Sequence, residues 1–467
     1  MSLTNKITAI SLLSLPGLIF PSCSKENEKN LPNIVILMTD DMGYFDLSCY
    51  GSEIQTPNID GLAEQGMKFT DFYCAAPNCS PSRAGLLTGR TPSRTGVYDY
   101  IPPNTPMHLP EDEITIAELL KNKGYSTCHV GKWHLSEWTR EDGMTDPTPD
   151  KQGFDYWFAV DNNSSPSHMD PVNFQRMGEK VGPLKGYSCQ LVAEEGIKWL
   201  KKMEGKEQPF FLNVWFNEPH HKLASPPELI AKHSDLEPKE ALYYANIENV
   251  DLAVGKILNV LEELQLSDNT IVMFTSDNGP WRRTSAGHFR AKKSSLYEGG
   301  IRAPGIFKWP GKITAGSVNN EPAGFIDILP TICEITEIPL PPGKHIDGTS
   351  ILPLLNEEEF VRDQSLFWFF YKSSPTAVIR KGDYILTADP VENYRSKSHP
   401  IDQTDLDYLK SLKLVKFQLF NIKEDVGQDR DISELMPGKL EELKTEMLSV
   451  HKSMISEGPM LEGLISD

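Results

Sequence analysis

Four short apolar segments that end in polar residues constrain the fold of this chain more than any other feature. The segments span residues 33–38 (NIVILM), 126–130 (STCHV), 209–216 (PFFLNVWF) and 270–276 (TIVMFTS). They are rich in β-branched and aromatic side chains, and apolar and polar positions do not alternate within them. Short runs of this kind are typical of strands that are buried on both faces of a sheet.

Helical patterns lie between these segments. Residues 113–121 and 194–202 show the spacing of amphipathic helices, and a third set recurs at helical intervals: Ile247, Val250, Val254, Ile257 and Leu261. Alternating strands and helices favour a mostly parallel sheet with helices on both faces. The sequence therefore predicts an α/β fold with one large central sheet.

Polar side chains that can bind metals or transfer protons follow each of the four predicted strands. In chain order these residues are Asp40 and Asp41, Lys132 and His134, His220 and His221, and Asp277 and Asn278. In open α/β sheets, sites form beyond the carboxyl ends of the strands. We therefore expect these groups to meet at one edge of the sheet. If the chain stays extended from Lys132 to His134, both side chains lie on the same side.

The chain changes character near residue 360. Residues 361–467 contain alternating strand patterns, a turn at residues 381–383 and a predicted helix at residues 440–454. This pattern predicts a small antiparallel sheet with a helix. We predict a large domain at residues 31–360 and a C-terminal subdomain at residues 361–467, in keeping with an apolar share of 39% and a charged share of 24%.

The first thirty residues are typical of an export signal. An apolar run at residues 7–20 follows Lys6 and is too short to span a bilayer. The Ser22-Cys23 pair at its end resembles a bacterial lipoprotein signal, with Cys23 as the lipidated first residue of the mature chain. The predicted parts are a signal peptide at residues 1–22 and a polar linker at residues 23–30. An ordinary secretory signal is the alternative. Both interpretations place the protein in the periplasm or at the cell surface, with membrane contact only through the lipid.

The net charge of −19 argues against nucleic acid as a partner, because phosphate binding requires a basic face. A local cationic pocket within an acidic surface still suits a small anionic substrate.

Residues 79–90 (CSPSRAGLLTGR) resemble the signature of type I, formylglycine-dependent sulfatases. The matching positions are Cys79, Pro81, Ser82, Arg83, Leu87, Thr88, Gly89 and Arg90. Further blocks between residues 32 and 355 are similar to that family, among them TSDNGP and YEGGIRAP. The resemblance implies the alkaline-phosphatase-like fold and a sulfuric ester hydrolase. A structural thiol at Cys79, or a disulfide to Cys74, is the alternative that the isolated residue would favour.

The resemblance implies that a separate maturation enzyme oxidises Cys79 to Cα-formylglycine. The hydrated aldehyde carries two hydroxyls, of which one attacks sulfur and the other later expels sulfate. Pro81 suits the first turn of a helix, whose free N–H groups would face the developing anion. Arg83, one turn after Cys79, is implied to hold the diol.

The resemblance also implies a metal site at Asp40, Asp41, Asp277 and Asn278, with the modified Cys79 as a further ligand. Oxygen donors select a hard divalent cation, with Ca²⁺ preferred and Mg²⁺ second. Turn formation at strand ends is the alternative for either pair alone.

Three further site residues are implied by the family pattern. Lys132 would hold the diol and sulfate, and His134 would take a proton when sulfate is expelled. His220 would bind sulfate and help to protonate the leaving oxygen, with the adjacent His221 as the alternative.

Lys293 is implied to be a second sulfate-binding lysine, with Lys292 as the alternative. The family usually has glycine after this lysine, where this chain has Ser294.

Two other functions compete with sulfate ester hydrolysis. One is hydrolysis of phosphate or phosphonate monoesters in the same superfamily, and the other is a non-catalytic carbohydrate-binding role. A sulfated carbohydrate or other sulfated small molecule is the expected substrate. The loops of this chain that select the substrate are expected at residues 162–165, 168–176, 281–290 and 394–399.

Overall fold

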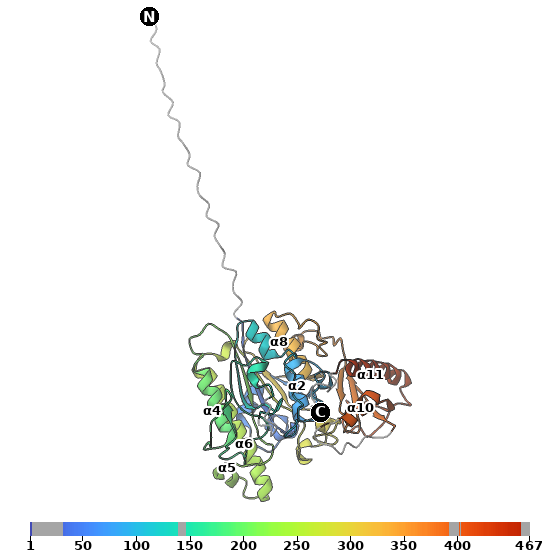
Figure 1. Cartoon of the computed structure of the whole chain (residues 1–467), viewed down its shortest axis with the longest axis horizontal. Helices are drawn as coiled ribbons and strands as arrows, with labels where there is room; N and C mark the ends of the chain where they lie inside the picture. Colours follow the sequence, from blue (N-terminus) through green and yellow to red (C-terminus); the bar gives the residue numbers. More distant parts are fainter. Residues whose placement is uncertain (2–30, 139–145, 392–400, 402, 459–467) are drawn as a thin grey trace. The chain divides into compact units, whose positions relative to one another are not determined.

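The computed structural model describes Met1 and residues 31–138, 146–391, 401 and 403–458. The described residues from Pro32 onward belong to one compact unit, whose centre is a sheet in the order β11-β2-β10-β9-β1-β8-β4-β5-β6-β7 (Figure 1). In that order the strands are Ser317–Asn319, Met67–Phe69, Gly305–Lys308, Thr270–Ser276, Asn33–Thr39, Phe210–Trp215, Ser126–Lys132, Tyr156–Val160, Gln175–Arg176 and Glu179–Lys180. A two-stranded ladder pairs β3 (Phe72–Tyr73) with β12 (Ala323–Gly324).

The four strands predicted from the sequence are direct neighbours in the middle of this sheet. β1 pairs in parallel with β9 on one side and with β8 on the other, and β8 pairs in parallel with β4. Their carboxyl ends therefore lie at one edge, as predicted. β10 joins β9 in antiparallel direction, so the sheet is mostly rather than wholly parallel.

Burial on both faces explains why these strands lack alternation. Val35, Leu37, Leu212 and Val214 pack into a core formed with helices on one face. The intervening Ile36 is just as buried, on the opposite face. Both faces of the central strands therefore require apolar side chains.

The helices of the described residues include one at each helical segment that the sequence predicts, although the bounds differ by several residues. They are α1 Pro57–Glu64, α2 Cys79–Thr88, α3 Ile116–Asn122, α4 Ser188–Leu200, α5 Pro227–Ala231, α6 Pro238–Glu263, α7 Glu298–Ile301, α8 Ile328–Thr336, α9 Leu352–Leu355, α10 Gln403–Ser411 and α11 Pro437–Glu457. α4 and α6 lie side by side in contact with each other (Figure 1). α3 begins later than predicted because Thr115 forms a capping box with Glu118.

The predicted C-terminal sheet is present as four antiparallel strands, β13 to β16. They span Leu366–Phe369, Ala377–Lys381, Tyr384–Pro390 and Leu414–Asn421. α11 contacts this sheet, as the sequence predicted (Figure 1). The indole N–H of Trp368 in β13 donates to the carbonyl of Cys74, five residues before Cys79. The C-terminal sheet is thus packed against the loop that leads to α2.

The six described cysteines are free thiols, so Cys74 and Cys79 form no disulfide. Within the described ranges, no helix has the length and apolar character needed to cross a membrane. The predicted signal peptide and Cys23 lie outside the described residues.

Candidate active site

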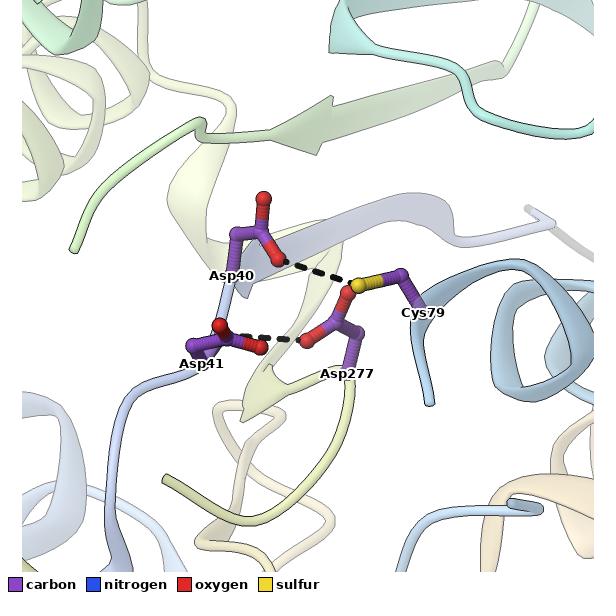
Figure 2. A group of neighbouring side chains, drawn as sticks. All are labelled: Asp40, Asp41, Cys79 and Asp277. Atoms are coloured by element: carbon purple, nitrogen blue, oxygen red, sulfur yellow. Dashed lines mark hydrogen bonds between the residues drawn. The ribbon is translucent and has the colours of Figure 1, made fainter. Parts of the chain in front are cut away.

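Three carboxylates and one thiol converge at the carboxyl edge of the central strands. Asp40 and Asp41 follow β1, Asp277 follows β9, and Cys79 is the first residue of α2 (Figure 2). One ligand atom from each of these residues lies within 4.8 Å of the others, and all four residues are buried. The thiol of Cys79 is 3.5 Å from Asp40 Oδ1, and the backbone N–H of Asp41 donates to Asp277 Oδ1 at 3.1 Å (Figure 2). The structure thus brings these four residues together at the edge of the sheet.

Each carboxylate of this cluster has a cationic partner. Lys132 Nζ is 2.7 Å from Asp40, and Lys293 Nζ is 2.6 Å from Asp41. Arg83 donates from Nε and a terminal nitrogen to the same oxygen of Asp277, at 3.0 and 2.7 Å. Buried carboxylates require such partners, because an isolated buried charge is costly. Three acids and three cations therefore balance in formal charge.

Burial and the nearby charges together determine which groups at the site are ionised. Burial opposes ionisation of Asp40, but Lys132, His220 and Arg83 hold its pKa well below the ordinary value. Burial raises the pKa of Asp277 to about 6, and the charge of Asp40 contributes. Burial also raises the pKa of the Cys79 thiol above its ordinary value. An unmodified Cys79 is therefore a poor nucleophile, because the thiolate is the reactive form.

Lys293, rather than Lys292, reaches Cys79. Its ammonium is 3.3 Å from Cys79 Sγ, in addition to its contact with Asp41. Burial disfavours its charge, but Asp41 and other nearby anions raise its pKa well above the ordinary value. The exposed Lys292 instead donates to the carbonyl of Trp281 at 2.8 Å.

His220, rather than His221, faces the acidic cluster. Its Nε2 lies 3.6 Å from Asp41 Oδ2, and its Nδ1 lies 3.2 Å from the carbonyl of His221. Since a carbonyl only accepts, Nδ1 carries the proton and leaves Nε2 directed toward Asp41. His221 is exposed and packs against Trp281, with ring centroids 4.5 Å apart.

Lys132 and His134 are both buried, but the extended geometry predicted between them is wrong. β4 ends at Lys132, and His134 adopts a left-handed conformation with φ of 56°. At this turn the N–H of Trp133 donates to the carbonyl of Val160, the last residue of β5, and the N–H of His134 donates to the carbonyl of Asp161. His134 Nε2 donates to the carbonyl of Ile101 at 3.0 Å, which leaves a lone pair on Nδ1. Burial and the charge of Lys132 lower the pKa of His134 well below the ordinary value, so the imidazole ring is neutral.

The donor set fits a hard divalent cation. Three carboxylates supply oxygen atoms, and Asn278 supplies an amide oxygen beside them. The amide Nδ2 of Asn278 donates to Asp41 at 2.7 Å, whereas its buried Oδ1 has no hydrogen-bond partner among the described residues. A buried acceptor without a donor is unfavourable, and a bound cation would satisfy it.

Two further residues contact the cations of the site, although the sequence does not predict these contacts. The sequence places Asn163 only in a specificity loop, yet its Oδ1 accepts from Lys132 at 3.1 Å. It follows β5, so the strand-end rule would have found it had that strand been predicted. Trp215 ends β8 and lies under Arg83, whose guanidinium carbon is 5.0 Å from the centre of its ring. No sequence pattern signals this contact.

A cavity of about 380 Å³ opens beside the cluster. It is lined by Pro102, Pro103, His134, Glu137, Asn162, Asn163 and Asn173, among others. Its volume and its convergent polar groups are those of a small-molecule site. A buried cysteine, an acidic cluster and three cations beside such a cavity are typical of a hydrolase that acts on anionic esters.

Comparison with known proteins gives the family. A sequence model of the family described as Sulfatase matches residues 32–338. The chain is 34% identical over 386 residues to N-acetylgalactosamine-6-sulfatase of Canis lupus familiaris, covering 76% of this chain and 71% of that protein. It is also 34% identical over 390 residues to arylsulfatase A of Homo sapiens, covering 76% and 74%. The chain belongs to the sulfatase family, and the prediction of a type I sulfatase is confirmed.

Solved structures agree with this assignment. The structure of Ps i-CgsB in complex with k-i-k-neocarrahexaose is similar with a TM-score of 0.77 and 27% identity, covering 92% of this chain and 94% of that chain. The PsFucS1 sulfatase from Pseudoalteromonas sp. is similar with a TM-score of 0.74 and 25% identity, covering 92% and 91%. Phosphonate monoester hydrolase of Agrobacterium radiobacter, at 19% identity and a TM-score of 0.61, shares the fold.

Proposed function

We propose that this protein hydrolyses sulfate esters of carbohydrates, with a formylglycine derived from Cys79 as the nucleophile. The observation that carries the proposal is the position of Cys79 Sγ, between Asp40 at 3.5 Å and Lys293 at 3.3 Å within a buried acidic cluster. A thiol with a raised pKa is unsuited to nucleophilic attack there. Conversion by a maturation enzyme would replace it with an aldehyde that hydrates to a diol, whose two hydroxyls support attack on sulfur and then release of sulfate.

The cations of the site would hold the sulfate group. The ammonium groups of Lys132 and Lys293 contact the carboxylates of Asp40 and Asp41, and Arg83 lies one helical turn from Cys79. α2 begins at Cys79, so the free N–H groups and positive dipole end of this helix add to the field. Such preorganised donors stabilise charge that develops in the transition state.

The two histidines would move protons. His134 is neutral, and its Nδ1 lone pair suits it to accept a proton when sulfate is released. His220 Nε2 is directed toward the cluster, where a proton on this atom would be available to the leaving oxygen.

One divalent cation would be held by Asp40, Asp41, Asp277, Asn278 and the modified Cys79, and would favour ionisation of a nucleophilic oxygen. We propose Ca²⁺, because carboxylate and amide oxygens in an irregular cluster suit its flexible coordination better than the strict octahedron of Mg²⁺. Added to balanced acids and cations, the ion would give the site a net positive charge that attracts a sulfate ester.

A carbohydrate substrate is supported by two observations. The similar structure of Ps i-CgsB holds k-i-k-neocarrahexaose. The cavity beside the cluster, about 380 Å³ in volume, presents amide and carboxylate groups that would hydrogen bond to sugar hydroxyls. Of the predicted specificity loops, residues 162–165 contribute Asn162 and Asn163 to this cavity, whereas residues 394–399 lie outside the described residues.

Export and the domain division complete the proposal. We propose that residues 1–22 direct the chain out of the cytoplasm, with Cys23 as a lipid attachment site. We also propose residues 361–467 as a C-terminal subdomain next to the catalytic residues 31–360.

The decisive experiment combines mass spectrometry with turnover. The peptide that contains residue 79 should be about 18 Da lighter than its thiol form, the mass lost when SH₂ is exchanged for O. The converted protein should release sulfate from an aryl sulfate and from some members of a panel of sulfated saccharides. Cys79→Ala should abolish release, and Cys79→Ser should sulfate itself at most once. Sustained full activity in the serine variant would overturn the mechanism.

A further inference from the structure

The loop that carries Lys293 to the nucleophile position is held in an unfavourable backbone conformation. Ala291 has φ of 64° and Ser294 has φ of 69°, on either side of the lysine pair. Residues with a Cβ rarely adopt this left-handed conformation, and strain of this kind collects at functional sites. Some interaction must therefore maintain the loop in this shape.

Two segments of the active site hold the loop through its backbone. The N–H of Lys293 donates to the carbonyl of Pro280, which follows β9, at 3.0 Å. The N–H of Ser294 donates to the carbonyl of Pro77, which precedes α2, at 2.9 Å. The loop thus bridges the segment that carries Asp277 and the segment that carries Cys79.

Ser294 adds a side-chain bond to the residue next to the nucleophile. Its hydroxyl donates to Asn78 Oδ1 at 2.8 Å. Asn78 precedes Cys79 directly, is 4% exposed and is the N-cap residue of α2. Glycine, the usual family residue here, would relieve the strain but could not make this bond.

Asn78 is held on its other side by residues that connect it to the C-terminal sheet. Its Nδ2 donates to Asp99 Oδ1 at 2.9 Å, and Lys372 is 2.8 Å from Asp99 Oδ2. Lys372 lies three residues after β13. The hydroxyl of Ser373, the next residue, accepts from the N–H of Leu296 at 3.2 Å. Leu296 lies at the end of the loop that carries Lys293. The C-terminal region thus contacts both the support of Cys79 and the loop of Lys293.

We propose that Ser294 is a positioning residue. It ties the backbone that presents Lys293 to Asn78, and Asp99 and Lys372 fix Asn78 from the opposite side. The distance between the Lys293 ammonium and the nucleophile is thereby set by a hydrogen bond that offsets the strained conformation of Ser294. This inference rests on the proposed function, because it assigns a task within that same site.

Two variants of Ser294 separate positioning from stability. Ser294→Ala removes the hydroxyl and keeps the strain, so both kcat and Tm should fall. Ser294→Gly removes the hydroxyl and the strain, so Tm should be at or above the wild-type value while kcat stays low. With an aryl sulfate, we expect kcat to fall about fivefold in both variants, the scale of one hydrogen bond, and KM to change less than twofold. If Ser294→Gly restores kcat together with Tm, Ser294 is merely structural and the inference fails.

A double-mutant cycle tests whether Ser294 acts through its hydrogen bond to Asn78. In an Asn78→Leu background, Ser294→Ala should change kcat by less than about 1.5-fold, because the acceptor of its hydroxyl is already gone. A full fivefold loss in that background would show that Ser294 acts on something other than Asn78. Should Asn78→Leu fail to fold, the comparison of the alanine and glycine variants decides alone.

Gln265→Gly provides a control for the backbone. Gln265 also has a positive φ, of 57°, but it lies before β9 at the amino edge of the sheet. Its replacement should raise Tm without changing kcat.

Activity is normalised to the formylglycine content of each variant. Absence of sulfatase turnover in the wild-type chain would refute the proposed function, whereas the ratios of variants to wild type judge the role of Ser294.

Discussion

Replacing Lys293 by alanine removes a cation that contacts the proposed nucleophile position, and the neighbouring Lys292 supplies a matched control. The Lys293 ammonium lies 3.3 Å from Cys79 Sγ and its side chain is 19% exposed. A unit charge about 4 Å from a developing negative charge contributes about 4 kcal/mol at an effective dielectric constant of about 20. Water that enters the vacated space recovers part of this energy. We therefore expect a loss of about 10²–10³-fold in kcat/KM, the scale measured for single oxyanion donors.

The same assay on Lys292→Ala should give a change of less than about threefold, because its exposed ammonium contacts only the carbonyl of Trp281 among the interactions described. Both variants would be compared on one aryl sulfate at fixed ionic strength, after correction for formylglycine content. Asp41 keeps its bond from Asn278 when Lys293 is absent, so the acidic cluster should remain folded. A larger loss in the Lys292 variant, or no loss in either, would refute the reasoning.

Three further outcomes are expected. Chelation should abolish turnover, and Ca²⁺ should restore it more fully than Mg²⁺; recovery only with Zn²⁺ would contradict an oxygen-ligand site. Trp215→Leu should lower kcat/KM about tenfold by removing the aromatic face under Arg83, whereas Trp215→Phe should stay within about threefold; equal losses would show that the ring does not support the guanidinium. Burial lowers the pKa of His451 to about 4, below the unfolded value of about 6.5, so the folded state should lose roughly 3 kcal/mol as the pH falls from 6.5 to 4. His451→Phe should flatten this dependence in thermal melts, and an unchanged pH profile would exclude the residue as its source.

The central sheet and the acidic cluster could be predicted because both depend on local patterns. Burial on two faces forces continuous apolar strands, and the polar residues that follow them must then share an edge. Asp40 and Asp277 are 237 positions apart in the sequence, yet the strand rule alone brings them together. The motif around Cys79 indicated the type of reaction, since neither composition nor periodicity distinguishes a nucleophile from a structural thiol.

The remaining features depend on tertiary contacts that leave no local trace. The turn at His134 is held by hydrogen bonds to Val160 and Asp161 at the end of β5, and the residue type of His134 does not signal it. The left-handed conformation of Ser294 contradicts its residue type and is maintained by Asn78 and Pro77, more than 200 positions earlier. The sequence likewise leaves Lys292 and Lys293 equivalent, because both side chains are long and only the folded backbone decides which one points inward.

The position of β1 between β8 and β9 has a consequence for the order of events during synthesis. Residue 79 leaves the ribosome nearly two hundred residues before Thr270–Ser276, the strand that completes the centre of the sheet. Once that strand has docked, Cys79 is 2% exposed at the start of a buried helix, where no second enzyme could bind the surrounding residues in extended form. The proposed oxidation must therefore precede docking of β9. The rate at which the chain folds then determines what fraction of the protein becomes active, and a slowly folding variant could be more completely converted than the wild type.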